Sequence, residues 1–91
     1  MTRVTFTNRI GTICPDGGFD VSDVEVTFVD ADLIPAQSVA AIVTRFDGVT
    51  AYAEVLALDI REAVEEVLGE ADGLSVLVRQ IQGHGVTVEV S

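Results

Sequence analysis

The sequence contains no lysine and no tryptophan, and it has a single cysteine and a single histidine. One cysteine cannot form a disulfide within the chain, so no covalent cross-link supports the fold. No apolar run approaches the roughly 18 residues that cross a bilayer, and the N-terminus shows no basic segment followed by an apolar one. We therefore expect a cytoplasmic protein without membrane contact.

Basic residues are also scarce, because five arginines stand against 15 acidic residues and give a net charge of −10. Repulsion of this kind opposes compaction at low ionic strength and is screened by salt, so a salt-loving, halophilic source is our hypothesis. Unspecific binding of nucleic acid is disfavoured, since it depends on basic side chains that neutralise phosphates. A nucleic-acid partner would have to meet the five arginines, which are Arg3, Arg9, Arg45, Arg61 and Arg79.

The 91 residues suit one domain, residues 1–91, with a single core. Two segments in the first third alternate between apolar and polar residues, which predicts two half-buried strands. Val4 and Phe6 mark the first strand, and Val24, Val26 and Phe28 mark the second. A segment rich in glycine and aspartate, with Cys14 at its start, joins them.

The middle of the chain changes to helical periodicity. A first helix is predicted from Pro35 to Asp47-Gly48, and a second begins after Thr50, a candidate N-cap, and stops at Gly69. The apolar stripe of the first helix consists of Val39, Ile42, Val43 and Phe46, and that of the second of Leu56, Ile60, Val64, Val67 and Leu68.

Two further alternating segments follow, around Val76 and Val88, and the glycine-rich "QGHG" joins them. The order ββααββ predicts an α+β fold with an antiparallel four-stranded sheet and both helices on one face. Such a short open sheet leaves two edges unpaired. Closure into an oligomeric barrel would remove them, so we expect self-association into a homo-oligomeric ring or double ring.

Three stretches carry a resemblance to a known family: "ICP" at the end of the first strand, "FDVSDVEVTF" in the second, and "AYAEVLALDI" in the second helix. Together with the order of elements they resemble the tunnelling fold (T-fold), and within it the family of the nitrile reductase QueF and the QueF-like archaeosine synthases. The resemblance extends from about Val4 to Val90, and it depends on the ordered set rather than on one motif.

The resemblance implies a substrate and roles for five residues. The family acts on 7-cyano-7-deazaguanine, and Cys14 matches the cysteine that attacks the nitrile carbon to form a thioimide. Asp20 matches the acid that carries the proton, a role that needs a dry pocket. Glu54 matches the glutamate that accepts two hydrogen bonds from the purine edge. Tyr52 and His84 are further candidates for substrate binding.

Departures from the reductase pattern decide between the two branches. The reductases carry a lysine-rich stretch for the phosphates of NADPH, whereas this chain has "LIPAQSVAA", and their Arg-Gly-Gly turn is Gly83-His84-Gly85 here. The resemblance therefore implies amidine formation, with ammonia as co-substrate and no NADPH, on a base within tRNA or DNA. An NADPH-dependent reductase is the alternative.

Other readings of these residues remain open. The family has a histidine directly before the anchoring glutamate, where this chain has Ala53, and the segment between Cys14 and Asp20 is one residue shorter. Cys14 is equally compatible with a small buried side chain and Glu54 with a solvated acid at a helix start. His84 lies between glycines, which is typical of a turn. No common metal-ligand spacing is present, so no metal is expected. A non-catalytic module that binds a purine or pterin is the competing class.

Overall fold

The computed structural model describes residues 1–31, 33–71 and 73–91. The elements follow the predicted order ββααββ. They are β1 (Arg3–Ile13), β2 (Phe19–Val29), α1 (Ala36–Thr44), α2 (Ala53–Leu68), β3 (Ser75–Gln82) and β4 (Thr87–Val90). Neither helix is long and apolar enough to cross a membrane within these described ranges.

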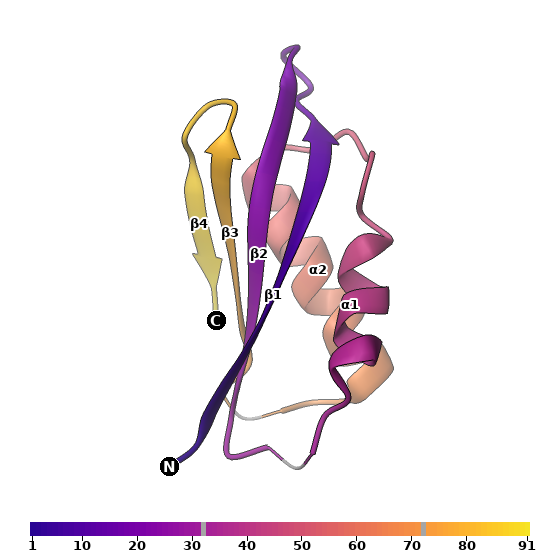
Figure 1. The fold of residues 1–91 in the computed structure, drawn as a ribbon, viewed down its shortest axis with the longest axis vertical. Coiled ribbons are helices and arrows are strands. Elements are labelled where there is room, and N and C mark those ends of the chain that lie inside the picture. The colour runs from indigo at the N-terminus through magenta and orange to yellow at the C-terminus, as the bar shows by residue number, and fades with distance from the viewer. Residues whose placement is uncertain (32, 72) are drawn as a thin grey trace.

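The four strands form one sheet in the order β1-β2-β3-β4, and every neighbouring pair is antiparallel. Both helices lie on the same face of this sheet (Figure 1), α1 against β1 and α2 against β3 and β4. The predicted α+β arrangement is therefore confirmed. β1 and β4 are the two edges of the sheet in the single chain.

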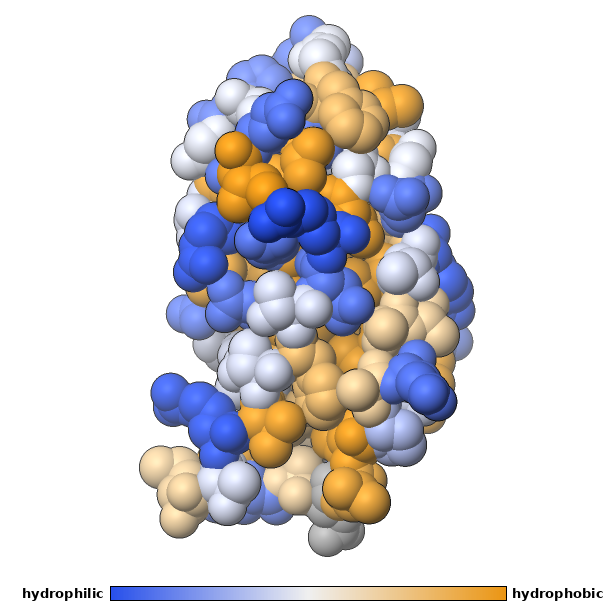
Figure 2. Space-filling model, viewed as in Figure 1, coloured by the Kyte–Doolittle hydropathy of each residue, from blue (hydrophilic) through white to orange (hydrophobic). Residues whose placement is uncertain are grey.

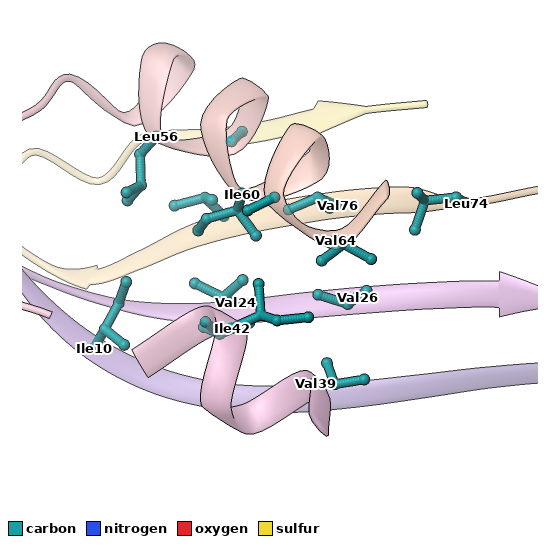
Figure 3. Close-up of a cluster of buried hydrophobic side chains, with 14 of the residues drawn as sticks. Ile10, Val24, Val26, Val39, Ile42, Leu56, Ile60, Val64, Leu74 and Val76 are labelled. Carbon is teal, nitrogen blue, oxygen red and sulfur yellow. The ribbon is translucent and has the colours of Figure 1, made fainter. Parts of the chain in front are cut away.

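The core fills the space between the sheet and the helices (Figure 3). Alternation along β2 sends every second side chain into this layer, and the apolar stripes of the helices meet them from the other side. Phe6 and Phe28 pack edge to face, with ring centroids 6.0 Å apart. The fully buried apolar side chains include Val24, Val26, Phe28, Val39, Val43, Leu56, Ile60, Val64, Val76 and Val78.

Three details of the predicted helices are wrong. α1 ends at Thr44 rather than at Asp47-Gly48, so Phe46 lies in the turn that follows it. Thr50 does not cap α2, because its backbone pairs with Ile13 in a parallel bridge and the helix begins only after Tyr52, which occupies the N-cap position. Val67 was expected on the buried stripe but is 55% exposed, and the next residue, Leu68, is only half-buried. Both lie in the last turn of α2, and helical phase alone does not show how far the packing partners of a helix extend.

The other face of the sheet carries two ion pairs between neighbouring strands. Arg9 binds Asp23 at 2.9 Å across β1 and β2, and Arg79 binds Glu25 at 2.7 Å across β2 and β3. The hydrogen bond from Arg9 lowers the pKa of Asp23 below its ordinary value, against the opposing effect of desolvation. Figure 2 shows hydrophilic and hydrophobic residues interspersed over this side of the molecule.

Candidate active site

Cys14 and Asp20 lie at the end of the sheet where β1 turns into β2. Cys14 directly follows β1, and Asp20 is the second residue of β2. Both share the side of the sheet that carries the core, so Cys14 is only 8% exposed and Asp20 only 2%. The short loop is closed by hydrogen bonds between the backbones of Cys14 and Gly18, at 3.0 Å, and of Gly17 and Cys14, at 2.9 Å. The loop thus folds back on itself instead of extending into solvent.

His84 reaches the same place from the turn between β3 and β4. Its Nδ1 atom lies 3.1 Å from Oδ1 of Asp20. The Cys14 Sγ atom, one Asp20 carboxylate oxygen and one His84 ring nitrogen all lie within 4.8 Å of one another. The His84 side chain is 53% exposed, so it forms the solvent side of an otherwise buried group. We call these three residues the Cys14–Asp20–His84 cluster.

A close backbone approach at Gly83 makes this arrangement possible. Gly83 has a φ of 125°, a conformation that favours glycine, and any β-carbon there would overlap Oδ1 of Asp20. The register of β2 against β3 also shifts between Val21 and Ser22, beside Asp20. Such a bulge re-aims the strand end that it interrupts. Gly83 and the bulge therefore bring His84 against the buried carboxylate.

The segment before α2 is tied to the end of β1 through its backbone. The Ile13 N–H donates to the carbonyl of Val49 at 2.9 Å, and the Ala51 N–H donates to the carbonyl of Ile13 at 3.0 Å. This pairing places Tyr52 and the first turn of α2 next to the Cys14 loop. The position of Cys14 relative to the helix start therefore depends on backbone hydrogen bonds rather than on particular side chains.

Tyr52 closes over the loop, and its hydroxyl donates a 2.9 Å hydrogen bond to Asp16. This bond is the main cause of the raised pKa of Tyr52; burial and the nearby charges of Asp16, Cys14 and Glu54 raise the pKa further. The bond to Asp16 places the Tyr52 hydroxyl at the loop that follows Cys14. Tyr52 thus hydrogen-bonds to Asp16, whereas Asp20 lies beside Cys14 and His84.

Glu54 lies in the first turn of α2 and is exposed. Within the described ranges, its carboxylate is found in no hydrogen bond or ion pair with another side chain. The preceding residue, Ala53, is buried in the core. The structure thus brings Cys14, Asp20 and His84 together and leaves Glu54 directed to solvent near them.

Two hollows of the single chain lie away from the cluster. One, of about 610 Å³, is lined by Phe46 and by acidic residues of α2 such as Asp59 and Glu62. The other, of about 520 Å³, lies at the opposite end of the sheet around Phe28 and Leu68. Neither contains a residue of the cluster, so they offer no pocket for chemistry at Cys14.

The sequence did not reveal the proximity of Cys14 and His84. The two residues are 70 positions apart, and local spacing, which is how ligand and catalytic motifs are recognised, carries no information about such a contact. The usable signal was glycine on both sides of the only histidine. Gly83 tolerates the close approach to Asp20, which Ala or a larger residue would prevent.

The cluster has the components of nucleophilic chemistry. A thiol becomes a strong nucleophile when a nearby base takes its proton, and Asp20 is a buried carboxylate in the same cluster. His84 contacts that carboxylate from the solvent side. A group that arrives beside Cys14 would meet a thiol, a carboxylate and an imidazole together.

Comparisons with known proteins support the fold. No protein-family model and no curated protein matches the chain. Among solved structures, the crystal structure of the archaeosine synthase QueF-like in the apo form matches with a TM-score of 0.78 at 24% sequence identity. The match covers 99% of this chain and 90% of the other. The chain therefore has the fold of that archaeosine synthase, and the predicted resemblance is confirmed at the level of fold.

Proposed function

We propose that this chain is an enzyme of the QueF-like type, which forms a thioimide between Cys14 and a 7-cyano-7-deazaguanine base and releases it with ammonia as the amidine of archaeosine. The observation that supports this most is the meeting of a buried thiol, a buried carboxylate and an imidazole within 4.8 Å, in the fold of an archaeosine synthase. The resemblance had assigned chemistry to two of these three residues.

In the first step, the Asp20 carboxylate accepts the proton of the Cys14 thiol. The thiolate attacks the nitrile carbon, one π bond of the nitrile breaks, and its nitrogen takes the proton back from Asp20, which gives a neutral thioimide. In the second step, ammonia attacks the same carbon and the sulfur leaves as the thiolate. The proton lost by ammonia returns to the sulfur through Asp20, so the thiol is regenerated and no reductant is used.

Glu54 is proposed to anchor the purine. Its carboxylate is exposed in the first turn of α2, and it is free to accept two parallel hydrogen bonds from a guanine-like edge. His84 lies beside Cys14 and Tyr52 contacts the loop that follows it, and both are proposed to contact the base. Ala53 contributes no polar group, so His84 is the imidazole of this site.

The pocket is proposed to be completed by another copy of the chain. Glu54 and Tyr52 are exposed in the single chain, and among the described residues the outer edges of β4 and of β1 before Gly11 pair with no further strand. Pairing of these edges in a homo-oligomeric ring would satisfy their backbone groups and cover the site. A target base within tRNA or DNA would have to be extruded to enter such a pocket, with arginines holding its phosphates.

The test is the intact mass of the protein after incubation with 7-cyano-7-deazaguanine at low and high salt. We expect an adduct of one base per chain that is absent in Cys14→Ala. Asp23→Asn is a suitable control for Asp20→Asn, because Asp23 lies on the same strand with its side chain on the other face. No adduct in the wild type at any salt concentration would reject the covalent mechanism.

Adding a co-substrate to the adduct separates the branches of the family. Release by ammonium as an amidine supports the proposal, whereas release by NADPH as an amine supports the reductase. The absence of lysine disfavours the reductase, because the phosphates of NADPH would meet no lysine in a chain of net charge −10. The base in tRNA, the base in DNA and the free base are compared as substrates in the same assay.

A non-catalytic purine-binding module is the second candidate function. It is favoured by Ala53, which occupies the position of the family histidine and is buried in the core. This function predicts saturable binding of a purine or pterin that depends on Glu54 and is unchanged in Cys14→Ala. Equilibrium binding to the two variants, Glu54→Gln and Cys14→Ala, distinguishes the two functions.

A further inference from the structure

The Cys14–Asp20–His84 cluster also has the composition of a metal site. A thiolate, an imidazole and a carboxylate are the three kinds of protein ligand that zinc accepts, and three protein ligands with one open position are typical of a reactive zinc centre. The site could not be recognised from local spacing in the sequence, because Cys14 and His84 are 70 positions apart. In the fold, the three ligand atoms lie within 4.8 Å of one another.

We propose that this cluster binds one divalent transition-metal ion of the zinc type, through Cys14 Sγ, an oxygen of Asp20 and a ring nitrogen of His84. In a tetrahedral site with ordinary zinc bond lengths, ligand atoms are separated by roughly 3.5 Å. The His84 and Asp20 atoms are already 3.1 Å apart, and no separation in the cluster exceeds the tetrahedral value by more than about 1.3 Å.

The ligands differ in exposure in a way that suits metal entry. Cys14 and Asp20 are buried and are fixed by the end of the sheet, whereas His84 is half-exposed on a turn between two glycines. A small shift of this turn brings the imidazole onto an ion held by the other two ligands. The fourth position then faces the solvent side, where water or a small ligand completes the coordination.

The ligand set and the charge of the chain favour a particular class of ion. Thiolate and imidazole suit zinc and its neighbours in the first transition series, while magnesium and calcium prefer oxygen ligands alone. The net charge of −10 raises the local concentration of any cation. Specificity must therefore come from Cys14 and His84 rather than from the acidic surface.

Metal binding at this place has a direct chemical consequence. The ion displaces the thiol proton into solvent and occupies the sulfur lone pair that would attack a nitrile. Zinc would thus inhibit thioimide formation reversibly, and a chelator would restore it. This regulatory consequence rests on the proposed function, whereas the binding of the metal does not.

The test is a titration of the reduced, metal-free full chain with Co²⁺. Because the chain has one cysteine, a thiolate-to-cobalt charge-transfer band in the near ultraviolet reports Cys14 alone. We expect a band that saturates at one ion per chain, disappears on addition of Zn²⁺ and is unaffected by Mg²⁺. Cys14→Ser should abolish the band, and His84→Asn and Asp20→Asn should each weaken Co²⁺ binding by at least about 10-fold.

Glu62→Gln is the control for unspecific attraction, because Glu62 is an exposed acid on α2 far from the three ligands, and it should leave the Co²⁺ affinity unchanged. Circular dichroism checks that each variant is folded. The absence of a charge-transfer band in the folded wild type would overturn the proposal. An unchanged affinity in both His84→Asn and Asp20→Asn would overturn it as well.

Failure of the metal site and failure of the proposed function give different results. A cobalt band without any nitrile adduct in the presence of chelator supports the metal site and rejects the thioimide chemistry. An adduct that forms equally fast with equimolar Zn²⁺ and with chelator supports the chemistry and overturns the regulatory role of the metal.

Discussion

His84 Nδ1 lies 3.1 Å from Asp20 Oδ1, although the two residues are 64 positions apart in the sequence. The contact links the turn of the second hairpin to the strand that follows the turn of the first. It depends on Gly83, which has no side chain to separate the two turns.

Gly83→Ala should therefore destabilise the protein and displace His84. The positive φ and the overlap of the new methyl group with Asp20 together are expected to cost about 2–5 kcal/mol of the free energy of unfolding. Gly85→Ala is the matched control, since Gly85 also has a positive φ of 70° but no atom lies within 4 Å of its substituent. Its cost should be only about 1–2 kcal/mol. Urea denaturation measures both, and equal losses would contradict the close contact.

Asp20→Asn should abolish the proton transfer and keep the shape of the site. An amide cannot take the thiol proton, so the rate of adduct formation with the nitrile base is expected to fall by about 10²- to 10⁴-fold. Asp23→Asn on the opposite face of β2 should leave this rate unchanged. Time-resolved intact-mass measurements compare the two variants, and similar rates in both would remove Asp20 from the reaction.

The Tyr52 phenol should titrate above its ordinary pKa of 10.0. The hydrogen bond to Asp16 favours the neutral phenol in the folded state, so its contribution to stability is complete below pH 10 and is lost as the pH rises through the pKa of the folded state. Because the chain has one tyrosine and no tryptophan, ultraviolet absorbance of the phenolate reports Tyr52 directly. In Asp16→Asn the midpoint should fall toward the ordinary value, and an unchanged midpoint would show that Asp16 is not its cause.

Val64 and Val67 form a matched pair on α2. Val64 is fully buried and Val67 is 55% exposed. Val64→Ala removes two buried methyl groups and should lower the free energy of unfolding by about 1.5–3 kcal/mol. Val67→Ala should change it by less than about 0.5 kcal/mol in the single chain. Thermal and urea unfolding measure both. A large loss in Val67→Ala would indicate that another copy of the chain covers this residue.

The acidic surface of α2 should make stability depend on salt. Glu62 and Glu66 are exposed and four residues apart, so Glu66→Gln is expected to stabilise the helix by about 0.2–0.5 kcal/mol at low ionic strength and to have no effect at high salt. Glu65→Gln should instead destabilise the helix at low ionic strength, because it breaks the ion pair with Arg61. The free energy of unfolding of both variants, measured across a salt series, tests this prediction. A stabilisation by Glu66→Gln that persists at high salt would show that charge repulsion is not its cause.

The sequence predicted most of the fold because alternation and helical periodicity are local signals. The order ββααββ, the shared face of the helices and the buried positions of β2 all followed from them. The predictions for Val67 and Thr50 were wrong, because both environments depend on neighbouring segments. Val67 lies in the last turn of α2, which the rest of the fold does not cover, and Thr50 pairs with Ile13. Periodicity contains neither kind of information.

The candidate site was predictable only in part, for the same reason. The resemblance pointed to Cys14 and Asp20, and the structure places both at the same end of the sheet. The proximity of His84 required the register of β2 and β3, including the shift beside Asp20, which no local pattern showed. The meeting of the three side chains follows from that register together with the close approach at Gly83.

The backbone pairing of Ile13 with Val49, Thr50 and Ala51 fixes the end of β1 through main-chain hydrogen bonds. Tyr52 and Glu54 follow this pairing directly, and both side chains are exposed. Under the proposed function, exchange of Tyr52 or Glu54 would change which ligand the site recognises and leave the backbone at Cys14 in place. Ligand preference could then be redesigned separately from the proposed nucleophile, starting with the two residues that flank Ala53.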